Sequence, residues 1–101
     1  MFARVITARA GEGGFDAVIR LANRELPSVR QRPGFSGYFL LTDASSGNVI
    51  VISLWRTRED MEEVARGTAN GIRDDAIPET GLQALRLGTY DVAVQAGGAP
   101  E

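Results

Sequence analysis

The stretch GFSGYFLLTDASSGNVIVISLWRT, residues Gly34 to Thr57, decides how the rest of this chain folds. Phe35 to Leu41 predicts a strand, and Val49 to Trp55, which is rich in β-branched residues, predicts a second one. Asp43 to Asn48 between them is a cluster of turn-forming residues. Two strands joined by so short a turn are expected to pair as an antiparallel hairpin.

Both strands of this hairpin are apolar on both faces. Successive side chains of a strand point to opposite faces, so each strand divides into two sets, and every set is apolar. The sets are Phe35, Phe39 and Leu41 against Tyr38 and Leu40 in the first strand, and Val49, Val51 and Trp55 against Ile50, Ile52 and Leu54 in the second. A sheet with one face in water would instead alternate between apolar and polar residues. The hairpin is therefore expected to be covered on both faces.

A strand and a helix are predicted before the hairpin. Phe2 to Arg9 predicts the strand, with Phe2, Arg4, Ile6 and Ala8 on one face. An amphipathic helix of roughly 15 residues follows, because apolar residues recur there at helical spacing. Pro27 is expected either to bend this helix or to open a further turn after its end near Leu26. The apolar stripe consists of Phe15, Val18, Ile19, Ala22, Leu26 and Val29.

A second helix and a last strand are predicted after the hairpin. The residues TRED, Thr57 to Asp60, resemble a capping box with Asp in the place of Glu or Gln, so Thr57 is expected to cap the helix. Its predicted buried stripe is Met61, Val64, Ala65, Ala69 and Ile72. Asp74 to Gly81 is a polar connector, and Leu82 to Val94 predicts the last strand.

The order of these elements, β-α-β-β-α-β, is typical of an α+β, ferredoxin-like fold with a four-stranded antiparallel sheet. Both helices then lie on one face, and the other face is bare although the strands are apolar on both sides. A bare apolar face marks an interface, and a second copy of the same face is the simplest symmetric cover. We therefore expect one domain, residues 1–96, that forms a homodimer through its sheet faces, followed by a flexible tail at residues 97–101.

Composition excludes several kinds of chemistry and of partner. The 101 residues carry a net charge of -2, lack Cys and His, and use arginine for all 11 basic residues. An imidazole base, a thiolate nucleophile, a Schiff-base lysine and a His or Cys metal ligand are thereby excluded, and we expect neither a cofactor nor a metal. Without a basic excess no nucleic-acid partner is expected. Without an apolar run of transmembrane length or a signal peptide, we expect a soluble cytoplasmic protein with no membrane partner.

The hairpin and its flanks resemble a known family. Pro33-Gly34-Phe35, the polar turn, and Val51 to Thr57 leading into Glu59 and Asp60 are similar to the antibiotic biosynthesis monooxygenase (ABM) domain, and the similarity extends over about Phe2 to Val94. The resemblance implies a dimeric α/β barrel, in which two ferredoxin-like sheets pack face to face. It also implies a small apolar or aromatic ligand. Haem degradation is not expected, because that branch of the family uses a histidine as iron ligand.

The resemblance also implies a role for Trp55. In the enzymes that this chain resembles, a tryptophan at the end of the third strand lines a pocket, so Trp55 is the candidate catalytic and substrate-binding residue. A position in the core or in the dimer interface is the alternative. Four further candidates for substrate binding are Tyr38, Tyr90, Arg86 and Asn23. Their alternatives are tyrosines at the rim of a strand and polar side chains in water. Arg4, like Arg86, is placed on an outer strand, where it is a candidate to orient a phenolate or carboxylate.

Three hypotheses for the function follow. The first is a cofactor-independent monooxygenase of phenolic or polyketide-type substrates, in which the bound anion itself supplies electrons to oxygen. The second is a non-catalytic module that binds a small molecule or only dimerises. The third is an RNA-recognition domain, which shares the order of elements. It is the weakest, because the aromatic motif of such domains belongs on the third strand, which here reads VIVISLW.

Overall fold

The computed structural model describes residues 1–11, 14–67 and 83–96, and it confirms the predicted order of elements. These are β1 (Phe2–Arg9), α1 (Gly14–Arg30), β2 (Phe35–Asp43), β3 (Asn48–Trp55), α2 (Arg58–Gly67) and β4 (Gln83–Asp91). The predicted polar connector, the predicted stripe residues Ala69 and Ile72, and the tail 97–101 lie outside the described residues.

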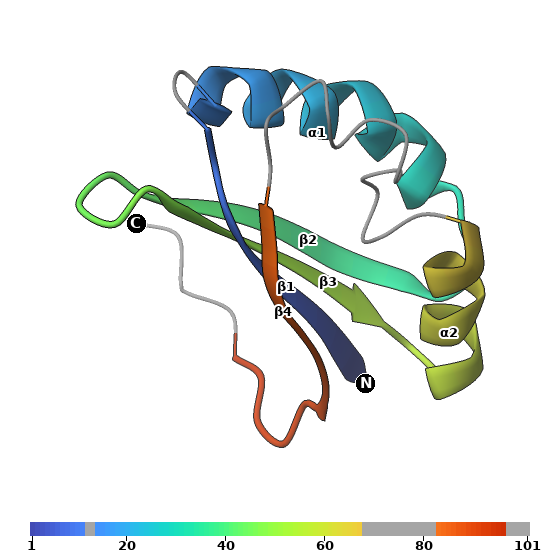
Figure 1. The fold of residues 1–101 in the computed structure, drawn as a ribbon. Helices are drawn as coiled ribbons and strands as arrows, with labels where there is room; N and C mark the ends of the chain where they lie inside the picture. The colour runs from blue at the N-terminus through green and yellow to red at the C-terminus, as the bar shows by residue number, and fades with distance from the viewer. Residues whose placement is uncertain (12–13, 68–82, 97–101) are drawn as a thin grey trace, which may run out of the picture.

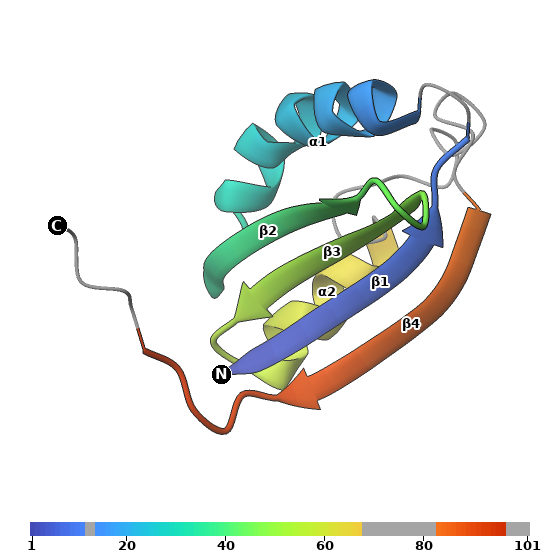
Figure 2. The same cartoon turned by 90° about the vertical axis from the view of Figure 1, so that its left-hand side faces the viewer.

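The four strands form one antiparallel sheet in the order β2-β3-β1-β4. Strand β1 is therefore central. The expectation that Arg4 lies on an outer strand is wrong. Both helices cover the same side of this sheet (Figure 1). Figure 2 shows the other side, on which no helix lies in front of the strands. We call the side that carries α1 and α2 the inner face and the other side the open face.

The inner face holds the apolar core, in two clusters of buried residues. In the first, Leu21 of α1 meets Val51 of β3, and Ile6, Tyr38 and Leu40 pack against the pair. In the second, Val29 of α1, Trp55 of β3 and Met61 of α2 come together, with Phe2 and Phe35 against them. Burial at this scale stabilises a small domain mainly through the removal of apolar surface from water.

A bulge in β2 changes one predicted assignment. The pairing of β2 with β3 shifts register between Phe35 and Gly37, so the chain gains one residue against its partner strand there. Phe35 lies opposite Trp55, and Tyr38 lies opposite Ser53, on the same face. The prediction that Phe35 shares a face with Phe39 and Leu41 is therefore wrong, because strict alternation does not hold across a bulge.

The open face is apolar and largely uncovered. Phe39, Leu41 and Tyr90 are 54%, 45% and 47% exposed, which is high for large apolar side chains. Between them the β3 residues Ile50, Ile52 and Leu54 are half-buried. The expected combination of a covered and a bare apolar face is thus present in this chain.

Helix α1 departs from its predicted stripe at two positions. Ile19 is 42% exposed, whereas Leu21, which was not predicted, is 3% exposed and belongs to the core. The helix also continues through Pro27 to Arg30, so it does not end near Leu26. Helical spacing alone did not determine how α1 is rotated about its axis, and so whether Ile19 or Leu21 faces the sheet. In the structure Leu21 contacts Val51 and is therefore the buried residue.

The connections at the ends of the hairpin depend on two glycines and one cap. Gly34 and Gly47 have positive φ values of 78° and 77°, which L-residues with a Cβ rarely adopt. The carbonyl of Gly34 accepts a hydrogen bond from the Arg56 amide at 2.8 Å, which ties the two ends together. The predicted cap of α2 is confirmed, because the Asp60 amide donates to the Thr57 hydroxyl at 3.1 Å.

Candidate functional site

One polar side chain from each strand forms a row across the inner face. Tyr38 of β2 lies opposite Ser53 of β3, Ser53 lies opposite Arg4 of β1, and Arg4 lies opposite Thr89 of β4. We call these four residues the polar row. The pairs on either side of it in the central strands are apolar, Phe2 with Trp55 and Ile6 with Val51. In the central strands the row therefore places hydrogen-bonding groups between apolar neighbours, and at its β4 end Thr89 is exposed.

Arg4 brings a positive charge into this layer. Its side chain is only 8% exposed, and burial lowers the pKa of its guanidinium from the usual value. The pKa of arginine starts so far above neutrality that the group still carries its charge at pH 7. A guanidinium with little access to water interacts strongly with any anionic atom that enters the same layer.

Ser53 fixes the orientation of Trp55. The indole Nε1–H donates a hydrogen bond of 2.8 Å to the Ser53 hydroxyl oxygen, and both residues are fully buried. The ring also meets Phe35 edge-on, at 5.7 Å between centroids and 80° between planes. Trp55 therefore points toward the helices and away from the open face. The sequence alone did not decide which face of the sheet carries this side chain.

Tyr38 supplies a phenol at the β2 end of the row. Its ring packs against the cluster of Leu21 and Val51, and it is half-buried. Burial raises the pKa of the Tyr38 hydroxyl to about 12, because the anion would lose its hydration. At pH 7 this hydroxyl is a neutral hydrogen-bond donor, and it is not available as a base.

The structure does not bring all predicted site residues together. Tyr38 and Trp55 share the inner face, whereas Arg86, opposite Thr7, and Tyr90, opposite Ala3, lie on the open face of β4. Asn23 is exposed on α1, where it lines an open hollow of about 350 Å³ with Leu26, Pro27, Arg30 and Gln31. The five predicted residues therefore occupy three separate places on the molecule.

Sequence reasoning missed Ser53 and Thr89, although a signal for Ser53 was present. Ser53 has the same alternation as Val49, Val51 and Trp55, so it is the polar member of an otherwise apolar set. Thr89 had no such signal, because its place opposite Arg4 depends on the pairing of the first strand with the last. Contacts between residues so far apart in the chain follow from the topology of the sheet.

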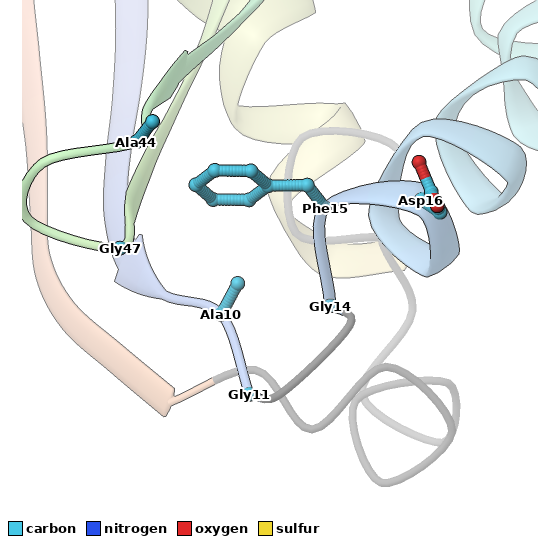
Figure 3. Close-up of a pocket in the computed structure, with 7 residues that line it drawn as sticks. All are labelled: Ala10, Gly11, Gly14, Phe15, Asp16, Ala44 and Gly47. Carbon is cyan, nitrogen blue, oxygen red and sulfur yellow. The ribbon is translucent and has the colours of Figure 1, made fainter.

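Two hollows lie at opposite ends of the sheet. The larger, about 390 Å³, is lined by Ala10, Gly11, Gly14, Phe15, Asp16, Ala44 and Gly47. Figure 3 shows the Phe15 ring pointing from the start of α1 toward the β2–β3 turn. The smaller, about 90 Å³, lies between β4 and α2 and is lined in part by Thr89 of the polar row. Neither hollow, nor the one beside Asn23, is lined by Trp55 or Tyr38.

Two further observations concern the part of the chain that the structure describes. No group of three or more acidic side chains there could together hold a metal ion. None of its helices has both the length and the apolar character that crossing a bilayer requires.

Fold and sequence together define the class of protein. Residues 1–68 match the family model described as antibiotic biosynthesis monooxygenase, so the chain belongs to the ABM family. A comparison with proteins of curated function gives no significant sequence match.

Solved structures show the same fold at low sequence identity. A protein from Deinococcus radiodurans assigned to the antibiotic biosynthesis monooxygenases is 17% identical, with a TM-score of 0.77 over 99% of this chain and 100% of that one. One from Nitrosomonas europaea with the same assignment is 14% identical, with a TM-score of 0.75 over 95% and 93%. The haem degrader MhuD from Mycobacterium tuberculosis, solved with two haems in its active site, is 17% identical, with a TM-score of 0.68 over 96% and 100%.

Proposed function

We propose that this protein is a homodimer that binds a small planar phenol at the polar row and oxidises it with molecular oxygen without a resident cofactor. The observation that carries the proposal is the polar row itself, in which the buried Arg4 and Ser53 lie between apolar pairs of the central strands. Small-molecule sites are mostly apolar and contain a few placed polar groups that orient the ligand. The haem of MhuD is not part of the proposal, since this chain contains no histidine.

Each residue of the row has a distinct role in this proposal. The Arg4 guanidinium favours the anionic form of a bound phenol, because an opposite charge nearby lowers the pKa of an acid. The neutral Tyr38 hydroxyl donates a hydrogen bond to the phenolate oxygen. Trp55, held by Ser53, presents a flat apolar surface to the aromatic ring once the ligand has displaced its neighbours in the core.

The proposed reaction needs only the phenol and oxygen. The phenolate donates electrons to O₂, one oxygen atom bonds to the ring carbon para to the hydroxyl, and the ring becomes a quinone. The other oxygen atom leaves as water with the two hydrogens that the phenol loses. For 1-naphthol the products are 1,4-naphthoquinone and one water molecule, which balances atoms and electrons.

The proposed homodimer forms through the open face. Phe39, Leu41 and Tyr90 are partly exposed there, around the half-buried Ile50, Ile52 and Leu54. An isologous contact between two copies would bury these side chains on both subunits. Since the row lies on the inner face, association and ligand binding would use opposite sides of the same sheet.

Binding is tested through the fluorescence of Trp55, the single tryptophan of the chain. We expect saturable quenching by the quinone juglone at micromolar concentration, and a loss of affinity of about tenfold in Arg4→Met because a charged hydrogen bond is removed. Trp55→Phe serves as the blank for the signal. Quenching that does not saturate would contradict a site beside the indole.

Oxidation is tested by oxygen uptake with 1-naphthol. We expect one O₂ consumed for each 1,4-naphthoquinone formed, at a rate above that of the naphthol alone in buffer. Saturable binding without oxygen uptake would leave the second hypothesis, a binding module without turnover. Oxidation requires that the phenol loses its proton to solvent, because neither Tyr38 nor Arg4 can act as a base at pH 7.

The dimer is tested by light scattering after gel filtration. Phe39→Asp places a charge in the proposed interface and is expected to give monomers at a concentration where the unchanged protein is dimeric. Ile19→Asp is the matched control, because Ile19 is a similarly exposed apolar residue on α1. An unchanged mass in Phe39→Asp, or an equal effect in Ile19→Asp, would contradict an interface on the open face.

A further inference from the structure

The small hollow between β4 and α2 combines a cation with a hydroxyl group at one end of the polar row. It has a volume of about 90 Å³, and the residues around it are Phe2, Arg58, Met61, Thr89, Tyr90 and Asp91. A single water molecule takes up about 30 Å³ in the liquid. The hollow therefore has room for a small group such as a carboxylate.

Arg58, the first residue of α2, is placed at this hollow by two contacts. The central carbon of its guanidinium lies 5.1 Å from the centre of the Phe2 ring, within the range of a cation–π interaction. One terminal nitrogen lies 3.8 Å from an Asp91 carboxylate oxygen. That ion pair is long, and both side chains are more than half exposed, so it contributes little stability and is easily exchanged.

The hollow is connected to the polar row through Thr89. This residue lines the hollow and also lies directly opposite Arg4 on the inner face. Phe2, under Arg58, lies two residues before Arg4 on the same face of β1. Phe2 and Thr89 therefore lie between two guanidinium groups. The Arg58 group is on the solvent side, and the Arg4 group is on the interior side.

We infer that this hollow binds the carboxylate of the ligand, with Arg58 exchanging Asp91 for that carboxylate and the Thr89 hydroxyl donating a hydrogen bond to it. The substrate class is then an aromatic acid that carries its phenolic hydroxyl at the end remote from its carboxylate. Arginine suits this role, because its planar guanidinium matches the geometry of a carboxylate. The inference rests on the proposed function, since it names a second anchoring point for the same ligand.

The test compares two probes of nearly the same shape, the anionic 6-hydroxy-2-naphthoate and the neutral 6-hydroxy-2-naphthamide, by isothermal titration calorimetry. We expect the naphthoate to bind about tenfold more tightly, as one charged hydrogen-bonded pair predicts. Arg58→Gln is expected to remove that preference and to leave the affinity for the naphthamide unchanged. Arg56→Gln is the matched control, because Arg56 is also exposed, two residues before Arg58, but does not line the hollow.

A second variant carries the test if Arg58→Gln fails to fold. Asp91→Asn removes the carboxylate that competes for Arg58, so affinity for the naphthoate is expected to rise severalfold. Equal binding of both probes to the unchanged protein, a preference that survives Arg58→Gln, or weaker naphthoate binding in Asp91→Asn would overturn the inference and leave the proposed function intact. If neither probe binds, the proposed function itself fails.

Discussion

The two faces of the sheet are built from the same strands, yet they differ in what they contain. In β3 the residues Val49, Val51, Ser53 and Trp55 are at most 1% exposed, whereas their neighbours Ile50, Ile52 and Leu54 are half-buried. The covered face nevertheless holds the buried arginine and serine, and the uncovered face is mainly apolar, with Arg86 and Thr7 as its polar pair between β4 and β1. Solvation alone would favour the opposite arrangement. The proposed function accounts for this difference: the polar groups of the inner face would bind the ligand, and the apolar groups of the open face would contact a second copy of the chain.

The prediction with the largest expected effect compares one substitution on each face of the sheet. Trp55→Ala is expected to lower the free energy of unfolding by about 4 kcal/mol, because it empties the cluster of Val29 and Met61. Leu54→Ala, one residue away on the open face, is expected to cost about 1 kcal/mol in the monomer. Urea denaturation followed by circular dichroism measures both. Equal costs would mean that the two faces are equally packed.

The turn that leads into β2 gives a second test. Gly34→Ala is expected to cost about 3 kcal/mol, because it adds backbone strain and its Cβ would overlap the Asp60 side chain at the start of α2. Gly47→Ala has the same positive φ and no atom within 4 Å, so strain alone is expected to cost about 1 kcal/mol. The difference between the two losses of stability measures how closely the turn at Gly34 packs against the Asp60 side chain of α2. A similar loss in both variants would remove the role of Asp60.

Burial of Tyr38 on the inner face predicts a loss of stability in alkali. Its pKa is raised to about 12 in the folded protein from 10.0 for the free side chain. The folded state therefore keeps a proton that the unfolded state releases, so stability is unaffected below pH 10 and falls by roughly 2 kcal/mol as the pH rises toward 12. Thermal unfolding between pH 9 and 12 measures this loss. In Tyr38→Phe the same part of the pH dependence should be absent.

The smallest effect concerns the helix that closes the inner face next to Trp55. Thr57→Ala is expected to destabilise the protein by about 1 kcal/mol, because the Asp60 amide loses its acceptor. Thr57→Ser retains the hydroxyl and should restore most of that stability. The midpoints of urea denaturation of the unchanged protein, Thr57→Ala and Thr57→Ser measure these differences in stability. A cost in both variants would point to loss of the threonine methyl group instead.

Much of the fold could be predicted from local patterns. The strand at Phe2–Arg9 has the predicted bounds, the hairpin strands differ only at their turn ends, and Thr57 caps α2. The bulge at the start of β2 was not predicted, although Ser36 and Gly37 interrupt the apolar run there and a glycine within a strand often marks a bulge, and it reversed the face of Phe35. In α1 the choice between Ile19 and Leu21 depended on where the sheet lies.

The candidate site was predictable only in part. Tyr38 and Trp55 were identified and share the inner face, but Arg86 and Asn23 lie elsewhere. Arg4 was considered for the wrong position, on an outer strand, and the sheet order places it at the centre. Arg4 belongs to the candidate site because it lies opposite Ser53 of β3 and Thr89 of β4. Strand β4 is near the other end of the chain, so local sequence patterns could not indicate this contact.

Apart from Phe35, which precedes the bulge in β2, the sequence by itself determined which residues of each hairpin strand point the same way, because the pleat alternates side chains with a period of two. It also determined that both faces are apolar, and hence that both need a cover. Only the tertiary structure decided which of the two faces lies under the helices, because that depends on how each helix crosses between its strands. The same decision placed Tyr38, Ser53, Arg4 and Thr89 side by side on the inner face, with Ser53 and Arg4 buried and Thr89 exposed, since strands distant in sequence meet only when the whole sheet has formed.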